Sequence, residues 1–213
     1  MEQALPLLQR PTMRNKTERV MKVLGIFGSP RQGGNTDILL EECLNGARSA
    51  GAEVVSIRCC DLKIEGCREC AGCDETGECV IEDDMQTVYP QLLEADVIIL
   101  ASPIFFYGIT AQAKALIDRC QALWCRQRLR EGAEKEMGPR KGRGYLICAG
   151  ATKGANLFQG TELVGKYFYD ALNMDYGGGV FVRKVEAKGD VRGRPETLKE
   201  AFTLGQSAAS HGP

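Results

Sequence analysis

Apolar residues gather in five short runs along the chain, and these runs predict five β-strands. Val23–Phe27, Val97–Ala101 and Tyr145–Ala149 are almost continuously apolar, which is typical of parallel strands covered by helices on both faces. Val54–Cys60 alternates more, as expected of a strand near an edge. Val180–Val182 follows three consecutive glycines and is the expected fifth strand.

Helical periodicity falls between these strands. It predicts helices over residues 40–47, 85–94 (capped by Asp83 or Asp84), 113–120 and 161–173, with a last one after Pro195. Strands that alternate with helices make right-handed βαβ units and a parallel sheet. We therefore expect an α/β fold: a flavodoxin-like, doubly wound, five-stranded parallel sheet in the order 2-1-3-4-5, with helices on both faces.

The chain is expected to form one domain with two additions. Its 213 residues, 44% of them hydrophobic, suffice for a single core. Residues 1–20 are polar, contain two prolines and are expected to be an extension or arm. Residues 21–213 form the domain, with an inserted cysteine loop over 61–80. Basic residues outnumber acidic ones from Arg126 to Arg143, which predicts an exposed loop.

Charge and residue counts exclude several functions. The net charge is −1, so no binding to nucleic acid is expected. No apolar run approaches the ~20 residues of a membrane span, and no signal peptide is evident, so the cytoplasm is the expected location. His211 is the single histidine, which argues against histidine-based catalysis. Ten cysteines without signs of secretion favour metal or redox chemistry over disulfides.

The loop after the first expected strand, residues 28–36, has the composition of an anion site. Its glycines allow close backbone approach, and the following helix presents free N–H groups. Ser29, Asn35 and Thr36 add neutral donors, and Arg31 adds a guanidinium that can bind phosphate through two N–H groups. The simpler interpretation is a glycine-rich connection with Asn35 capping the helix. The loop matches neither a P-loop nor a dinucleotide motif.

Cysteines at positions 67, 70, 73 and 79 have C-x2-C-x2-C-x5-C spacing. Bacterial ferredoxins use the same spacing for their first three cluster ligands, so this segment predicts a [4Fe–4S] cluster. Zinc, or reduced cysteines without metal, are the alternatives. Of the other cysteines, Cys60 and Cys125 have no assigned role. Cys43, Cys59, Cys120 and Cys148 are expected to be packing residues.

Residues 102–108 follow the third expected strand and carry three consecutive aromatic residues. Such a loop suits a flat ring with apolar faces, although it could instead cover a subunit interface. Residues 150–156 are a weaker third candidate. The phosphate, cysteine and aromatic loops follow strands one, two and three, so all are expected at the carboxyl edge of the sheet. The site for a flat ring and the cluster would then share one rim of the molecule.

Three segments carry a family resemblance: GSPRQGGNTDILLEECLNGA, CRECAGCDETGECVIEDDM and SPIFFYGITAQAKALIDR. They resemble the NADPH-dependent FMN reductase superfamily, and the cysteine spacing resembles its cluster-bearing branch, the iron–sulfur flavoproteins. The resemblance implies FMN and a homodimer or homotetramer with FMN near a subunit interface. The implied FMN contacts are Ser29, Arg31, Gly34, Asn35, Thr36, Pro103, Ile104, Phe105, Phe106, Gly108 and Thr152. The implied cluster ligands are Cys67, Cys70, Cys73 and Cys79.

The expected function is electron transfer through FMN and a [4Fe–4S] cluster, between a one-electron carrier such as ferredoxin and a small acceptor. No side chain is expected to act as acid or base, because the cofactors carry the chemistry. An NAD(P)H-dependent FMN or quinone reductase without a functional cluster is the alternative. A non-enzymatic redox sensor, or a module that only binds flavin or zinc, is a third.

Overall fold

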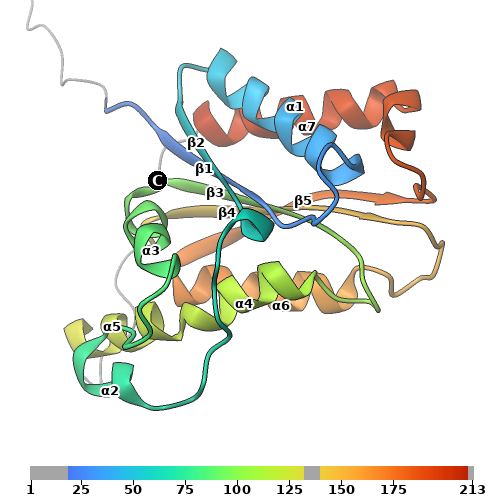
Figure 1. The fold of residues 1–213 in the computed structure, drawn as a ribbon. Coiled ribbons are helices and arrows are strands. Elements are labelled where there is room, and N and C mark those ends of the chain that lie inside the picture. The colour runs from blue at the N-terminus through green and yellow to red at the C-terminus, as the bar shows by residue number, and fades with distance from the viewer. Residues whose placement is uncertain (1–18, 132–139, 211–213) are drawn as a thin grey trace, which may run out of the picture.

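The computed structural model describes residues 19–131 and 140–210, in which strands and helices alternate (Figure 1). The strands are β1 (Lys22–Phe27), β2 (Glu53–Arg58), β3 (Val97–Pro103), β4 (Gly142–Gly150) and β5 (Met174–Arg183). The helices are α1 (Asn35–Ser49), α2 (Gly72–Thr76), α3 (Met85–Glu94), α4 (Ala111–Arg119), α5 (Gln121–Glu131), α6 (Gln159–Ala171) and α7 (Pro195–Ser210). Two 3₁₀ turns, η1 (Cys59–Asp61) and η2 (Asp190–Gly193), complete the set.

The strands form one parallel sheet in the order β2-β1-β3-β4-β5, as predicted. The order reverses between β1 and β3, the position where doubly wound sheets bind ligands beyond the carboxyl ends of their strands. Strand β5 begins earlier than expected, because Gly177 and Gly179 lie inside it. A side chain at Gly179 would meet the Leu146 carbonyl at 1.8 Å, so this strand approaches β4 at a site only glycine fits.

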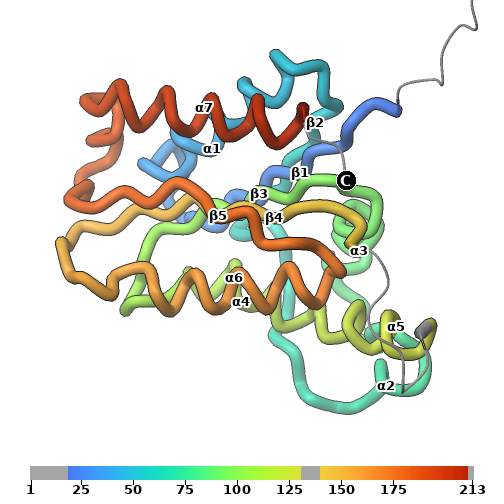
Figure 2. Tube along the Cα trace, turned by 180° about the vertical axis from the view of Figure 1, so that it is seen from behind, coloured from blue at the N-terminus to red at the C-terminus, as the bar shows by residue number. Residues whose placement is uncertain are grey.

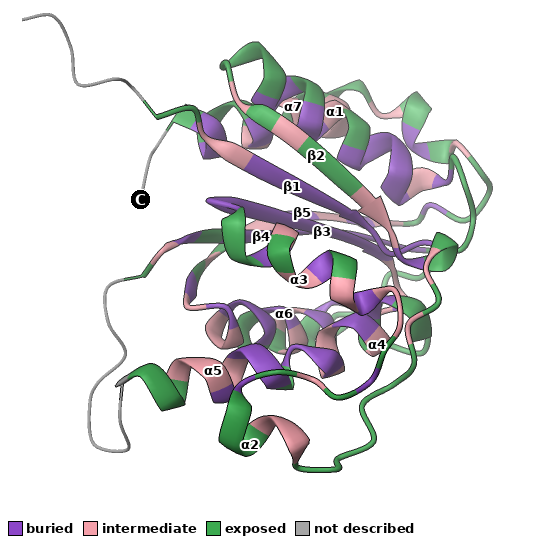
Figure 3. Ribbon diagram, turned by 60° about the vertical axis from the view of Figure 1, so that its left-hand side comes forward, coloured by how far each residue is buried: buried purple, intermediate pink, exposed green. Residues whose placement is uncertain are grey.

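Helices cover both faces of the sheet. Helices α1 and α7 pack on one face, and α3, α4 and α6 pack on the other (Figures 1 and 2). Each face has its own apolar core, with fully buried residues such as Leu39 and Leu44 on the first and Ile98 and Leu146 on the second. Figure 3 shows the middle strands buried between these layers. The apolar positions of the predicted helices thus pack against the two faces of the sheet.

Two helices were not predicted. The expected loop from Arg126 to Arg143 is helical up to Glu131, where α5 ends, and its last residues lie in β4; residues 132–139 lie outside the described part. Helix α5 has little amphipathic periodicity in its sequence, and it packs against the short helix α2 of the cysteine segment. Residues 1–18 of the expected arm (1–20) and His211 also lie outside the described residues. Within the described ranges, no helix has the length and apolar character required to cross a bilayer.

Helices α1 and α7 approach each other through two glycines. A Cβ atom at Gly205 would lie 1.7 Å from the Cys43 carbonyl oxygen, and one at Gly46 would lie 2.0 Å from the Phe202 carbonyl oxygen. No side chain fits at these distances. The close backbone contact therefore depends on both glycines.

We expect Gly205→Ala to destabilise the fold by about 1–3 kcal/mol, the usual cost of overpacking. In an open helix the same change stabilises by up to ~1 kcal/mol, so the sign itself is diagnostic. Urea unfolding followed by circular dichroism measures the effect. Gly193→Ala is the matched control, since nothing lies within 4 Å of a side chain there. An equal or higher stability for Gly205→Ala would contradict the close contact.

Candidate functional site

A cavity of about 210 Å³ lies at the carboxyl edge of the sheet, where the strand order reverses. Four segments line it: the β1–α1 loop, the end of β3 with the residues after it, the end of β4, and the chain after β5. Its lining residues are Ser29, Arg31, Gly34, Asn35, Thr36, Pro103, Ile104, Phe105, Ala149, Gly150, Ala151, Val185 and Glu186. Eight of the eleven residues predicted to contact FMN are in this set.

One end of the cavity is the N-terminus of α1. Gly34 is the N-cap residue, has extended backbone and provides no side-chain cap, so the first N–H groups of the helix keep no intrahelical acceptor. The buried Ser29 hydroxyl accepts the Arg31 N–H (3.1 Å), which shapes the loop in front of the helix. Free N–H groups and the helix dipole favour an anion at this end.

Asn35 holds a loop that lines the cavity. Its side-chain amide donates to the Ala187 carbonyl (2.9 Å), and its side-chain oxygen accepts the Val191 N–H (3.1 Å). Arg31 adds a donation to the Glu186 carbonyl (3.2 Å). The side chains predicted to bind phosphate thus also fix the chain after β5 across the cavity. Nothing in the local sequence around residues 184–191 indicated this partner.

A largely buried ion pair between Asp37 and Arg58 holds the loop 28–36 in place. The Asp37 carboxylate accepts the Gly33 N–H (2.9 Å) and pairs with Arg58 of β2 at 2.8 Å. The Arg58 guanidinium also lies over the Phe27 ring, 4.6 Å from its centroid. Arg58 thereby balances a negative charge close to the expected anion site. Sequence reasoning missed this pair, because it links the first turn of α1 to the last residue of β2.

The aromatic loop forms a tight turn at the mouth of the cavity. Phe105 and Gly108 exchange two backbone hydrogen bonds of 2.9 Å, and Phe106 and Tyr107 have positive φ angles of 49° and 62°. This conformation presents the Phe106 side chain fully to solvent and leaves the rings of Phe105 and Tyr107 about half exposed. Among the predicted contacts, Phe106, Gly108 and Thr152 are outside the lining set. The turn therefore places an exposed aromatic surface beside the cavity.

A second cavity, of about 690 Å³, is lined by all four cysteines of the C-x2-C-x2-C-x5-C segment. Cys67 and Cys70 are exposed, and Cys73 and Cys79 are partly buried. Glu69 and Ala71 have positive φ angles (51° and 58°), so the backbone turns sharply between successive cysteines. Helix α2 then carries Cys73, and Gly77 ends it in a left-handed conformation. The tight turns allow four cysteines within thirteen residues to line one cavity.

The second cavity does not share a rim with the first. The cysteine segment leaves the carboxyl end of β2 but then passes beneath the sheet to α5, at the end of α4 farther from the N-terminus of α1 (Figures 1 and 2). The two cavities have no lining residue in common. The expectation of a shared rim was wrong, because the segment is long enough to follow α4 toward the opposite edge.

Cys125 of α5 lies beside the cysteine segment. Its thiol donates to the Asp74 carboxylate (3.3 Å), and the ligand atoms of Cys73, Asp74 and Cys125 lie within 4.8 Å of one another. Burial and the neighbouring Asp74 raise the pKa of the Cys125 thiol to about 12. Cys125 therefore remains protonated at neutral pH and ties α2 to α5. No local pattern indicated this contact, because helix α5 was not predicted.

Of the remaining cysteines, the four expected to be packing residues are buried and Cys60 is exposed. Cys43, Cys59, Cys120 and Cys148 are buried in the two cores. Burial raises the pKa of Cys43 and Cys59 to about 12, so they behave as apolar packing residues. Cys59 lies in η1, just beyond the end of β2. Cys60 is exposed and follows it in the same turn.

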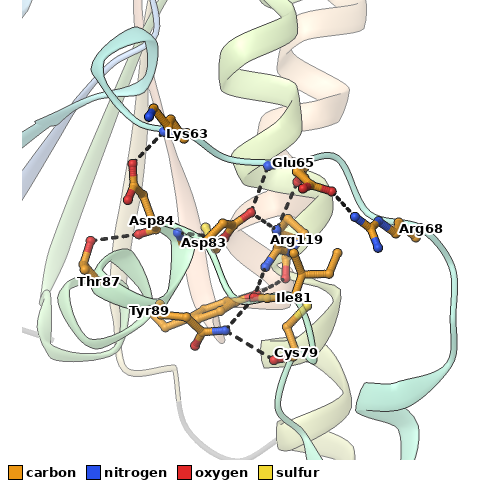
Figure 4. Close-up of polar contacts among 12 residues, drawn as sticks. Lys63, Glu65, Arg68, Cys79, Ile81, Asp83, Asp84, Thr87, Tyr89 and Arg119 are labelled. Atoms are coloured by element: carbon orange, nitrogen blue, oxygen red, sulfur yellow. Dashed lines mark hydrogen bonds and ion pairs between the residues drawn. The ribbon is translucent and has the colours of Figure 1, made fainter.

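Two acidic residues after the cysteines tie the segment to its own beginning (Figure 4). Asp83 accepts the N–H groups of Glu65 (2.9 Å) and Met85 (3.0 Å), the second bond capping α3. Asp84 accepts the Lys63 N–H at 2.7 Å. Burial opposes the charge on Asp83, but the Arg119 guanidinium and the two N–H donors outweigh it and lower its pKa. The segment 65–81 is thus closed into a loop at its base.

The fold and the first cavity together define a class. A doubly wound sheet whose strand-order reversal faces a helix N-terminus and an aromatic loop is a flavodoxin-like mononucleotide-binding domain. The chain belongs to the NADPH-dependent FMN reductase family, a family of FMN-dependent oxidoreductases, whose model matches residues 21–155.

Several curated relatives that are 37–45% identical to part of this chain are iron–sulfur flavoproteins. One from Methanocaldococcus jannaschii is 45% identical over 103 residues, which is 48% of this chain and 53% of the relative. One from Methanosarcina thermophila is 37% identical over 99 residues, covering 46% of this chain and 52% of the relative. The chain therefore aligns with about half the length of these relatives.

Solved structures share the fold at low sequence identity. An NAD(P)H:quinone oxidoreductase from Methanothermobacter marburgensis has a TM-score of 0.65 and 15% identity, covering 91% of this chain and 98% of that chain. A flavodoxin from the domain Archaea has a TM-score of 0.53 and 18% identity, covering 89% and 96%. These likenesses confirm the flavodoxin-like architecture.

Proposed function

We propose that this protein is an iron–sulfur flavoprotein, which transfers electrons between a one-electron carrier such as ferredoxin and a small-molecule acceptor. The observation that carries the proposal is the convergence of Cys67, Cys70, Cys73 and Cys79 on one cavity, separate from the cavity at the strand-order reversal. One chain thus offers two sites of different chemistry, one for a phosphate and a flat ring and one for thiolate ligands.

The first cavity suits FMN. The N-terminus of α1, the Arg31 guanidinium and Thr36 offer donors for its phosphate, while Pro103, Ile104 and Phe105 offer apolar contacts for its ring. A cavity of about 210 Å³ is smaller than the ~300–1000 Å³ usual for ligand sites. Part of the ring would therefore lie at the surface, beside the exposed Phe106. A neighbouring subunit that covers Phe106 would complete the site, in agreement with a proposed homodimer or homotetramer.

The second cavity suits a [4Fe–4S] cluster. It offers four thiols, which is the ligand number such a cluster requires, and its volume of about 690 Å³ leaves room for an inorganic core. Zinc requires only a compact four-sulfur tetrahedron. A space of this size, formed by tight turns at Glu69 and Ala71, favours the larger group.

The cofactors supply one- and two-electron chemistry when bound. The chain's own contribution is to hold them in fixed orientation and to set their surroundings. Ser29, Arg31 and Asn35 fix the loops around the first site, while Asp83 and Asp84 fix the base of the second. No side chain needs to transfer a proton for this function.

We expect anaerobically purified protein to contain FMN. It should also contain about four iron ions and about four acid-labile sulfide ions per chain. Reduced ferredoxin is expected to bleach the flavin absorbance rapidly, and NADPH only slowly. Elemental analysis and stopped-flow absorbance measure these two properties. FMN without iron, combined with rapid bleaching by NADPH, would instead support an NAD(P)H-dependent FMN or quinone reductase.

A further inference from the structure

Among the described residues, Arg119 has the largest fully buried side chain, and the proposed function assigns it no role. It is the last residue of α4, and its side chain has 0% of its surface exposed. An unpaired charge at such a position would cost several kcal/mol. The surroundings of Arg119 must therefore supply partners for its guanidinium, and these partners indicate what it does.

The partners all belong to the two ends of the cysteine segment (Figure 4). The guanidinium pairs with the Asp83 carboxylate at 2.6 Å and donates to the carbonyl oxygens of Glu65 (3.0 Å) and Ile81 (3.1 Å). Glu65 lies two residues before Cys67, and Ile81 lies two residues after Cys79. One side chain from α4 thus joins both ends of the segment that carries all four cysteines.

Arg119 also lines the cysteine cavity itself. In the described part of the chain, its Nε is buried without a hydrogen-bond partner. Burial opposes the charge, but the hydrogen bond with the Asp83 carboxylate outweighs it and raises the pKa of Arg119. The group is therefore a permanent positive charge, with a spare N–H donor, at the wall of a cavity bordered by Glu69 and Asp74.

We propose that Arg119 is the positioning residue of the cluster site: it fixes the spacing of the two ends of the cysteine segment and places a positive charge next to Cys79. This inference rests on the proposed function, since it assumes that the cavity holds a [4Fe–4S] cluster. Replacing a residue that bonds to a metal ligand typically changes metal affinity 10–100-fold. Hydrogen bonds to the sulfur atoms and nearby positive charge raise the reduction potential of a cluster.

The test uses variants that leave no unpaired charge buried at the position of Arg119 and Asp83. Arg119→Met alone would leave the buried Asp83 carboxylate without its partner, so the double variant R119M/D83N is the main probe. The matched control is R140M/D170N. It removes the ion pair between Arg140 and Asp170, whose atoms are 2.8 Å apart and which does not line the cysteine cavity. Arg119→Lys keeps the charge but not the planar arrangement of donors. FMN content and circular dichroism verify the fold of each variant.

For R119M/D83N we expect normal FMN content, iron loss to a chelator accelerated about 10-fold or more, and a lower midpoint potential in an EPR-monitored redox titration. Arg119→Lys should restore most of the potential but retain iron poorly, and the control should match the wild type. A wild-type protein that holds its cluster while R119M/D83N shows unchanged retention and potential would overturn this inference alone. A wild-type protein that takes up no iron would overturn the proposed function as well.

Discussion

Replacing Cys73 with serine should remove most of the iron and leave the FMN in place. A cubane with one thiolate missing loses a quarter of its protein ligands, and Cys73 is a partly buried member of the set, carried on α2. The flavin should remain because the two cavities share no lining residue. Iron, sulfide and FMN analysis of anaerobically purified protein measures both quantities.

The neighbouring thiol of Cys125 requires a second variant. It lies within 4.8 Å of the Cys73 sulfur and could replace that ligand in the Cys73→Ser protein. The double variant C73S/C125S removes this possibility, and Cys125→Ser alone controls for loss of the bond to Asp74. Cys60→Ser, an exposed cysteine outside the cavity, should keep all its iron. Full iron content in C73S/C125S would show that Cys73 is not a ligand.

Arg31→Ala should weaken FMN binding roughly 10- to 100-fold. A charge-assisted hydrogen bond to phosphate contributes about 1.5–3 kcal/mol, and each 1.4 kcal/mol corresponds to a factor of ten in Kd. Arg31 also bonds the Glu186 carbonyl, so its loss could disturb the chain after β5. Titration of apoprotein with FMN, followed by flavin fluorescence, gives the Kd.

Riboflavin separates these two effects, because it has the same ring and no phosphate. If Arg31 binds the phosphate, the affinity for riboflavin should change little while that for FMN falls. Arg31→Lys should recover part of the loss, since it retains the charge but not the bidentate geometry. An equal loss for both ligands would assign Arg31 a structural role through Glu186 instead.

The sheet and its order could be predicted from the sequence because they depend on local patterns. Val97–Ala101 and Tyr145–Ala149 are apolar on both faces, and the structure buries both faces. The loop 28–36 was readable for a similar reason, since glycines, a helix start and an arginine are adjacent in the chain. Cysteine spacing within 67–79 likewise reports a local arrangement.

What the sequence did not reveal depends on contacts between distant segments. Arg119 reads as the polar end of a helix, and only the path of residues 65–83 shows that it is buried. Helix α5 was missed because it packs against α2, an element defined by the cysteines and not by periodicity. The location of the second cavity was wrong for the same reason. Asn35 was read as a ligand or a cap, yet its side chain bonds Ala187 and Val191, more than 150 residues away.

The cysteine segment contributes little to either apolar core. Helix α2 has no buried residue, and none of the residues between Glu65 and Val80 belongs to the two core clusters. A region of this kind opens at much lower free energy than the sheet. Its amide protons should therefore exchange with deuterium long before those of β1 and β3 when the proposed cluster is absent. Release of the inorganic core would act as a local melting event, which leaves the rest of the molecule folded and available for reloading.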